Sequence, residues 1–137
     1  MTIECSQEDI GTVVDEILSR AGDNSVVLLH GDLASGKTTL VQECAKKLGI
    51  TDDVTSPTFS LQQQYTEHFF HYDIYNQGSE HFLELGLLED LEKNGLHFIE
   101  WSDEKLKNLL QSAGIKYLIV NIEKSSATTR LYKVEDA

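Results

Sequence analysis

Two segments of the chain place apolar residues at every third or fourth position, a spacing that predicts amphipathic helices. The first covers residues 10–18; Ser6 and Asp9 before it form the expected capping pair, and Gly22 ends the helix. The second begins at Lys37. Its buried face is expected to consist of Leu40, Val41, Cys44, Ala45 and Leu48.

Other segments are continuous apolar runs of strand length. The runs at 26–30 (VVLLH) and 96–101 (LHFIEW) are typical of strands that are buried on both faces, as in a parallel sheet. Runs rich in strand-forming residues predict hairpins as well. The two expected hairpins pair 58–66 with 67–73, across a break near Glu67, and 116–122 with 128–134.

Two further helices complete the pattern. Residues 79–92 have helical spacing that Gly86 weakens, and a helix that Gly114 ends is expected after the N-capping segment 102–104. Strands that alternate with helices indicate an α/β fold with a central mixed sheet, parallel and antiparallel, flanked by helices. We therefore expect a single domain over residues 1–137.

Length and charge narrow the function classes. The 137 residues suit one domain, and no apolar run reaches the roughly 20 residues that span a bilayer. The N-terminus is polar and acidic and shows no signal peptide, so we expect a cytoplasmic protein with no membrane partner. The net charge of −12 disfavours direct binding of DNA or RNA backbones, which requires a basic surface.

The strongest motif lies between the first predicted buried strand and the second helix. It fits G-x-x-x-x-G-K-[ST], a loop whose backbone N–H groups cradle phosphates. The matching residues are Gly31, Asp32, Leu33, Ala34, Ser35, Gly36, Lys37 and Thr38. In this pattern Lys37 neutralises the β- and γ-phosphates and Thr38 ligates Mg²⁺, so we expect the chain to bind a nucleoside triphosphate with Mg²⁺.

A phosphate loop also requires a second acidic residue at the end of a neighbouring strand. Both Glu100 and Asp73 meet this condition, and Glu100 is the preferred candidate. The segment 55–59 (TSPTF) lies where a switch loop would sit, although a capped turn accounts for it equally well. A zinc site at His68, His71 and Asp73 is disfavoured because a strand directs residue 68 away from the other two.

Missing motifs exclude several kinds of nucleotide-binding protein. There is no N-K-x-D sequence for guanine recognition, and no arginine lies between Lys37 and Arg130. A small-molecule kinase usually needs several arginines to neutralise phosphates on two substrates. We therefore expect a minimal ATPase whose turnover alone is slow and whose site a partner completes.

The motifs, taken together, resemble the TsaE (YjeE) family of bacterial ATPases for threonylcarbamoyladenosine modification of tRNA. The resemblance covers nearly the whole chain and follows the family's order. It is carried by GDLASGKTT (31–39), VTSPTF (54–59), HYDIY (71–75), LELGL (83–87) and FIEW (98–101). It departs from the family pattern at Ala34-Ser35, where Gly-Ala is usual, and at Asn76, where arginine is usual.

The resemblance implies a P-loop NTPase-like fold and a role for each motif residue. Residues 31–39, including Thr39, would contact ATP, and Arg130 is a candidate for the adenine end. Lys37, Asp73, Glu100 and Thr58 would be catalytic, and Thr38, Glu100 and Asp73 would act on Mg²⁺. Trp101 would lie beside the site and face a partner, although from the sequence a core position is equally consistent.

The resemblance also implies partners. The family acts with the transferase TsaD and its partner TsaB, which would make most of the tRNA contacts, and ATP hydrolysis would reset that assembly between turnovers. An alternative is a nucleotide-gated binding module in which ATP occupancy, rather than hydrolysis, is the signal.

Overall fold

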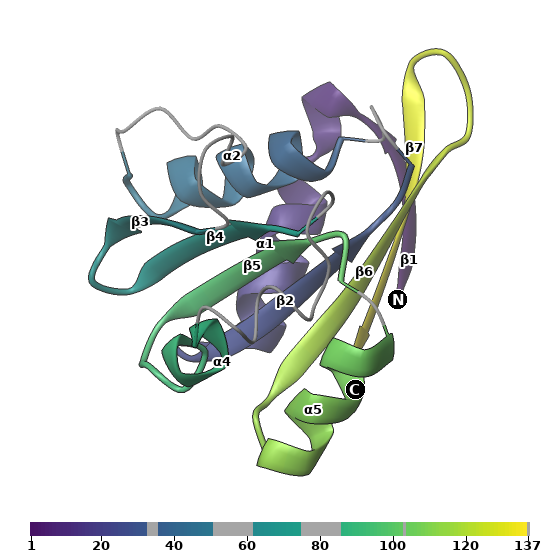
Figure 1. Cartoon of the computed structure of the whole chain (residues 1–137). Coiled ribbons are helices and arrows are strands. Elements are labelled where there is room, and N and C mark those ends of the chain that lie inside the picture. The colour runs from purple at the N-terminus through teal and green to yellow at the C-terminus, as the bar shows by residue number, and fades with distance from the viewer. Residues whose placement is uncertain (33–35, 51–61, 75–85, 103, 137) are drawn as a thin grey trace.

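A mixed sheet forms the centre of the computed structural model, which describes residues 1–32, 36–50, 62–74, 86–102 and 104–136 (Figure 1). Within these ranges the sheet has seven strands in the order β1-β7-β6-β2-β5-β4-β3. The strands are β1 (Thr2–Ser6), β7 (Thr129–Asp136), β6 (Tyr117–Lys124), β2 (Ser25–His30), β5 (Leu96–Glu100), β4 (Phe69–Asp73) and β3 (Gln62–Thr66).

Strands β6, β2, β5 and β4 are parallel and form the middle of the sheet. Both predicted hairpins are confirmed, since β3 pairs with β4 and β6 pairs with β7 in antiparallel register. Strand β2 is almost completely buried, which agrees with its uninterrupted apolar sequence. The sequence did not predict β1, whose short, half-polar segment is antiparallel to β7 at one edge.

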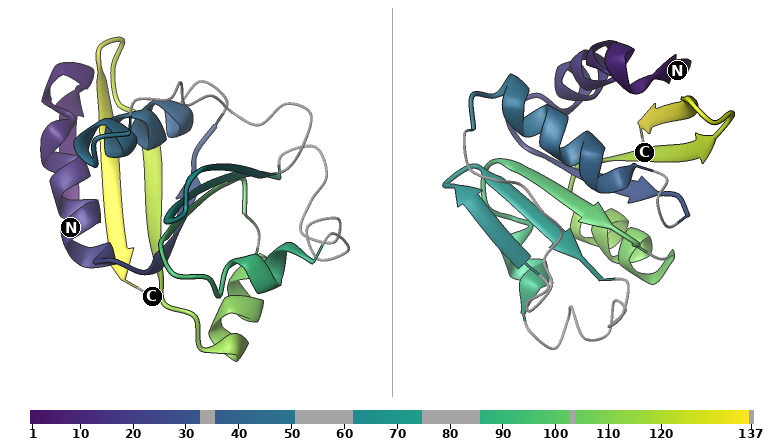
Figure 2. Two further views of the ribbon diagram at one scale, coloured as in Figure 1. Left: turned by 90° about the vertical axis from the view of Figure 1, so that its left-hand side faces the viewer. Right: turned by 90° about the horizontal axis from the view of Figure 1, so that it is seen from above.

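Helices cover both faces of the sheet. Helices α1 (Gly11–Ala21) and α2 (Lys37–Lys47) lie on one face, and α4 (Leu87–Asp90) and α5 (Glu104–Ala113) lie on the other (Figure 2). Alternation along β2 supplies both cores: Val27 and Leu29 pack under α1 and α2, whereas Val26 and Leu28 pack under α5. The α/β class and the flanked mixed sheet are therefore confirmed.

Two details of the sequence-based prediction are wrong, and a third is only partly within the described residues. The Ser6 hydroxyl donates to the Asp9 carboxylate (3.2 Å) instead of to a backbone N–H, and the two residues flank a short 3-10 turn, η1 (Gln7–Asp9), before α1. Leu48 is 49% exposed: α2 ends at Lys47, and Leu48 is its C-cap residue instead of part of the buried helix face. Of the predicted helix 79–92, residues 79–85 lie outside the described part of the chain, and the remainder is helical only over α4. Gly86, with φ +71°, directly precedes this helix.

The topology brings the carboxyl ends of the parallel strands to one edge, where ligands bind in open α/β sheets. Strand β2 leads there into the segment with the phosphate-loop pattern, and β4 and β5 end beside it, with Asp73 level with Glu100. Within the described parts of the chain, no helix has the length and apolar character needed to cross a membrane.

Candidate functional site

Lys37 is the first residue of α2, and its side chain reaches back to Gly31 and Asp32. Its ammonium group donates to the carbonyl oxygens of Gly31 (2.7 Å) and Asp32 (2.9 Å), and the residue is only 5% exposed. Burial lowers the pKa of Lys37, and the carboxylates of Glu100 and Asp73 partly oppose this shift. A desolvated cation therefore lies between the end of β2 and the start of α2, where it can attract an anion strongly.

Gly36 gives the chain its entry into α2. Its φ of +105° lies in the left-handed region that glycine adopts without strain, and its carbonyl accepts the first helical hydrogen bond from Leu40 (3.0 Å). The first N–H groups of α2 are directed along the helix axis beyond its N-terminus, an arrangement that can bind phosphates.

Thr38 and Glu100 lie in contact, as expected if they share one ligand. The Thr38 hydroxyl lies 2.9 and 3.1 Å from the two carboxylate oxygens of Glu100, to which it donates. Glu100 is the last residue of β5 and is 3% exposed. The two residues are 62 positions apart in the sequence, so the fold itself brings a hydroxyl and a carboxylate together at the end of β5.

The sequence missed a third member of this cluster, His71 on β4. Its Nε2 lies 2.5 Å from Glu100 and donates to that carboxylate, and the ring is fully buried. The Nδ1 atom has no hydrogen-bond partner in the described parts of the chain. A signal was available, because alternation along β4 places His71 on the same face as Asp73, next to the end of β5.

Asp73 lies where the sequence placed it. It pairs in register with Glu100. Its carboxylate is close enough to Lys37 to oppose part of the lowering of the Lys37 pKa. Two carboxylates, a hydroxyl and a buried ammonium thus lie near one another where β4 and β5 end and α2 begins.

Trp101 directly follows Glu100 and covers Lys37. The ammonium nitrogen is 3.8 Å from the centroid of the indole ring, a cation–π contact. The indole is half-buried and packs against the α5 core, so the structure gives Trp101 both a core role and a position beside the site.

The remaining predicted residues divide into two groups. Thr39 lies on α2, in the first turn of the helix. Arg130 is the second residue of β7 and is level with Lys124 on β6. Because β6 lies between β7 and β2, Arg130 is separated from β2 by one strand. Positions outside the described residues are Leu33, Ala34, Ser35 and the switch-like segment 55–58, Thr58 included.

The residues present fit a magnesium–nucleotide complex. Mg²⁺ prefers oxygen ligands and is usually held by one or two carboxylates together with substrate phosphates, not by a cage of protein ligands. Thr38, Glu100 and Asp73 supply such oxygens, and among the described residues no group of three acidic, histidine or cysteine side chains forms a cage. The alternative zinc ligand His68 is exposed in the β3–β4 turn, away from buried His71.

Comparisons with known proteins give one consistent result. Residues 5–132 match the family model described as "Threonylcarbamoyl adenosine biosynthesis protein TsaE". A Nostoc sp. protein named tRNA threonylcarbamoyladenosine biosynthesis protein TsaE is 43% identical over 102 residues, which are 69% of this chain and 61% of the relative. A Rickettsia felis protein of the same name is 37% identical over 98% of this chain and 78% of its own length.

The solved structures agree about the fold. A crystal structure of Bacillus subtilis YdiB superposes with a TM-score of 0.71 at 24% identity and covers 100% of this chain and 84% of that one.

Proposed function

The chain belongs to the TsaE family, and from this premise we propose that it is a Mg²⁺-dependent ATPase subunit that acts with TsaD and TsaB in threonylcarbamoylation of a tRNA adenosine. Its relatives are named for the biosynthesis of this modified nucleoside.

One observation carries the ATPase part. The Thr38 hydroxyl and the Glu100 carboxylate lie within 2.9 Å of each other, beside the buried ammonium of Lys37. Lys37 would bind the β- and γ-phosphates, and Thr38 and Glu100 would hold Mg²⁺, which neutralises developing charge on the phosphates when bound. Asp73, level with Glu100, would accept hydrogen bonds from the attacking water.

The arginines support dependence on a partner. Arg20 pairs with Glu16 on its own helix and with Asp136 (3.4 Å) at the end of β7. Asp136 is level with Leu118, near the start of β6. Because β6 is parallel to β2, Arg20 lies at the amino ends of these strands, whereas the phosphate-loop pattern follows the carboxyl end of β2. Arg130 lies two strands from β2. Because an arginine that stabilises the transition state supplies large rate factors, we expect slow turnover by the subunit alone.

The first test is steady-state hydrolysis of Mg-ATP by the purified protein, with and without TsaB and TsaD. We expect negligible turnover alone and clear stimulation by the partners. Equal rates in both conditions would show that the site is self-sufficient and would refute the argument from the arginines.

A second test separates hydrolysis from nucleotide gating. In Glu100→Ala, ATP binding and partner docking should survive while multiple-turnover tRNA modification stops. Glu92→Ala, which changes an exposed glutamate just after α4, is the matched control and should behave as the wild type. If Glu100→Ala continues to support modification without hydrolysing ATP, occupancy alone is the signal and the gating alternative is correct.

A further inference from the structure

Two chain segments leave the sheet side by side at the candidate site. After β2 the chain runs from His30 into Gly31, and after β5 it runs through Trp101 to Ser102. The Trp101 N–H donates to the carbonyl of Leu29 (3.3 Å), which extends the pairing of the strands beyond Glu100. One step further, His30 Nε2 lies 2.6 Å from the Ser102 hydroxyl and joins the two segments.

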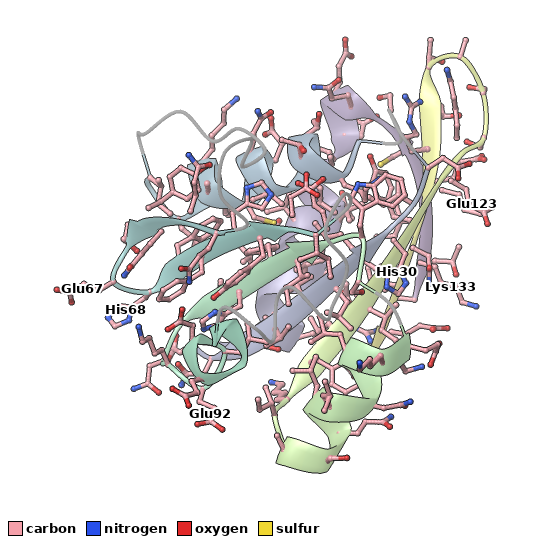
Figure 3. All side chains as sticks on the ribbon, in the orientation of Figure 1. His30, Glu67, His68, Glu92, Glu123 and Lys133 are labelled. Atoms are coloured by element: carbon pink, nitrogen blue, oxygen red, sulfur yellow. The ribbon has the colours of Figure 1, made fainter. Side chains whose placement is uncertain are left out.

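His30 is itself held from another strand. It is level with Asn121 on β6, and the Asn121 side chain partly opposes the lowering of the pKa of the ring. Figure 3 shows His30 between β6 and α5. Burial lowers the pKa of His30, so the ring is neutral at pH 7, with one donor and one acceptor nitrogen. A hydroxyl can donate or accept, so Ser102 can bond the ring in either tautomer.

Trp101 needs an anchor of this kind. Its φ of +67° is the only left-handed value of a non-glycine residue among the described positions. A bulky residue persists in that conformation only where its surroundings enforce it. Leu29 holds the backbone on one side of Trp101, and His30 holds Ser102 on the other.

The conformation of Trp101 determines what covers Lys37. The left-handed turn brings the indole ring over the Lys37 ammonium, with the nitrogen 3.8 Å from the ring centroid. The same ammonium donates hydrogen bonds to the carbonyls of Gly31 and Asp32. A lysine side chain loses considerable rotamer freedom when it is held in one place. Because Trp101, Gly31 and Asp32 already hold Lys37, its side chain loses this freedom when the protein folds and not when a phosphate binds.

We propose that His30 is a positioning residue: its hydrogen bond to Ser102 holds Trp101 in the left-handed turn and thereby keeps the indole ring against Lys37. The functional consequence rests on the proposed role of Lys37 in binding ATP. The positioning of Trp101 does not, and it can be measured in the nucleotide-free protein.

Trp101 is the single tryptophan of the chain, so its fluorescence reports its own surroundings. In His30→Ala and in Ser102→Ala we expect a red shift of the emission and a larger Stern–Volmer constant for acrylamide, because the indole moves away from Lys37 into water. The double variant should shift no further than either single variant, since both remove the same bond. His30→Gln, whose amide group replaces Nε2, should restore wild-type emission in part.

The matched control is His68→Ala, which removes an exposed histidine from the β3–β4 turn and should leave the emission unchanged. Wild-type emission and quenching in folded Ser102→Ala would overturn the proposal even if His30→Ala failed to fold, as would additive shifts in the double variant.

Mg-ATP titration gives the functional readout. Binding should weaken roughly threefold to tenfold in His30→Ala, the scale of a partly desolvated cation–π contact. If the fluorescence shifts as expected while Mg-ATP binding is absent from the wild type too, the proposed function fails and the positioning role stands.

Discussion

His71 holds the carboxylate of Glu100 through a fully buried hydrogen bond of 2.5 Å, and the carboxylate has Thr38 on its other side. In His71→Leu this donor is lost without a large cavity. Because partners of a metal-binding carboxylate set its orientation, we expect Mg²⁺-dependent ATP turnover in the presence of TsaB and TsaD to fall about 10–100-fold.

The measurement is turnover as a function of Mg²⁺ concentration. His97→Leu is the matched control, since His97 is equally buried but bonds Tyr72 and the carbonyl of Lys93, away from the phosphate loop. Both variants should be less stable than the wild type. An equal loss of turnover in both would mean that the effect comes from destabilisation and not from Glu100.

The two cysteines should differ in reactivity. Cys44 is fully buried on α2, and burial raises its pKa to about 12 from the ordinary 9.0, so it has almost no reactive thiolate at pH 8. We expect a chromogenic thiol reagent at pH 8 to label one thiol, Cys5, in native buffer and both in urea. Cys5→Ser should then show no native labelling. Rapid labelling of two thiols in native buffer would contradict this burial.

The same pKa shift predicts a direction for stability. The folded state favours the protonated thiol of Cys44, so its contribution is complete below pH 9 and is lost as the pH rises towards about 12. Urea denaturation of the wild type should therefore give a free energy of unfolding that decreases over this window. Cys44→Ala, which has no thiol to ionise, should decrease less steeply. Parallel curves for the two proteins would refute the assignment.

At the scale of elements, the turn before β5 depends on a glycine for two reasons. Gly95 has φ +129°, and a Cβ there would lie 2.5 Å from the backbone oxygen of His68. That same oxygen accepts a hydrogen bond from Leu96 (2.8 Å), so it cannot easily move. Gly114 has φ +71° but open space around it.

Gly114→Ala should therefore cost only the left-handed backbone, about 1–2 kcal/mol, whereas Gly95→Ala should cost clearly more. Urea denaturation of both variants measures the difference in the free energy of unfolding. Equal losses would show that β4 and β5 shift apart without penalty.

Sequence periodicity predicted the elements whose pattern is long and local. Strand β2 and helix α2 have such patterns, and both lie where expected. Strand β1 has none: five half-polar residues become a strand only because β7, more than 120 positions away, offers a free edge. The burial of Leu48 was predicted wrongly for a different reason: the helical pattern in the sequence continues one residue beyond the end of the helix.

The candidate site divides in the same way. Glu100 could be predicted because a carboxylate at the end of a buried strand, near a phosphate loop, is typical of a residue that binds the nucleotide's metal ion. The bond between His30 and Ser102 could not be predicted, because it spans 72 positions and depends on the backbone angle of one residue, Trp101. No local pattern encodes that angle.

At the scale of the whole molecule, the net charge of −12 sets the expected behaviour in solution. A protein this acidic is repelled by tRNA and attracted by basic surfaces, so we expect it to dock on proteins that hold the RNA.

Electrostatic attraction acts mainly on the association rate and is screened by salt. The rate constant for association with TsaB–TsaD should thus fall about tenfold or more between roughly 50 and 500 mM NaCl, while the dissociation rate changes little. Surface plasmon resonance at both salt concentrations separates the two rates. An association rate that hardly responds to salt would mean that apolar contacts, and not the acidic surface, select the partner.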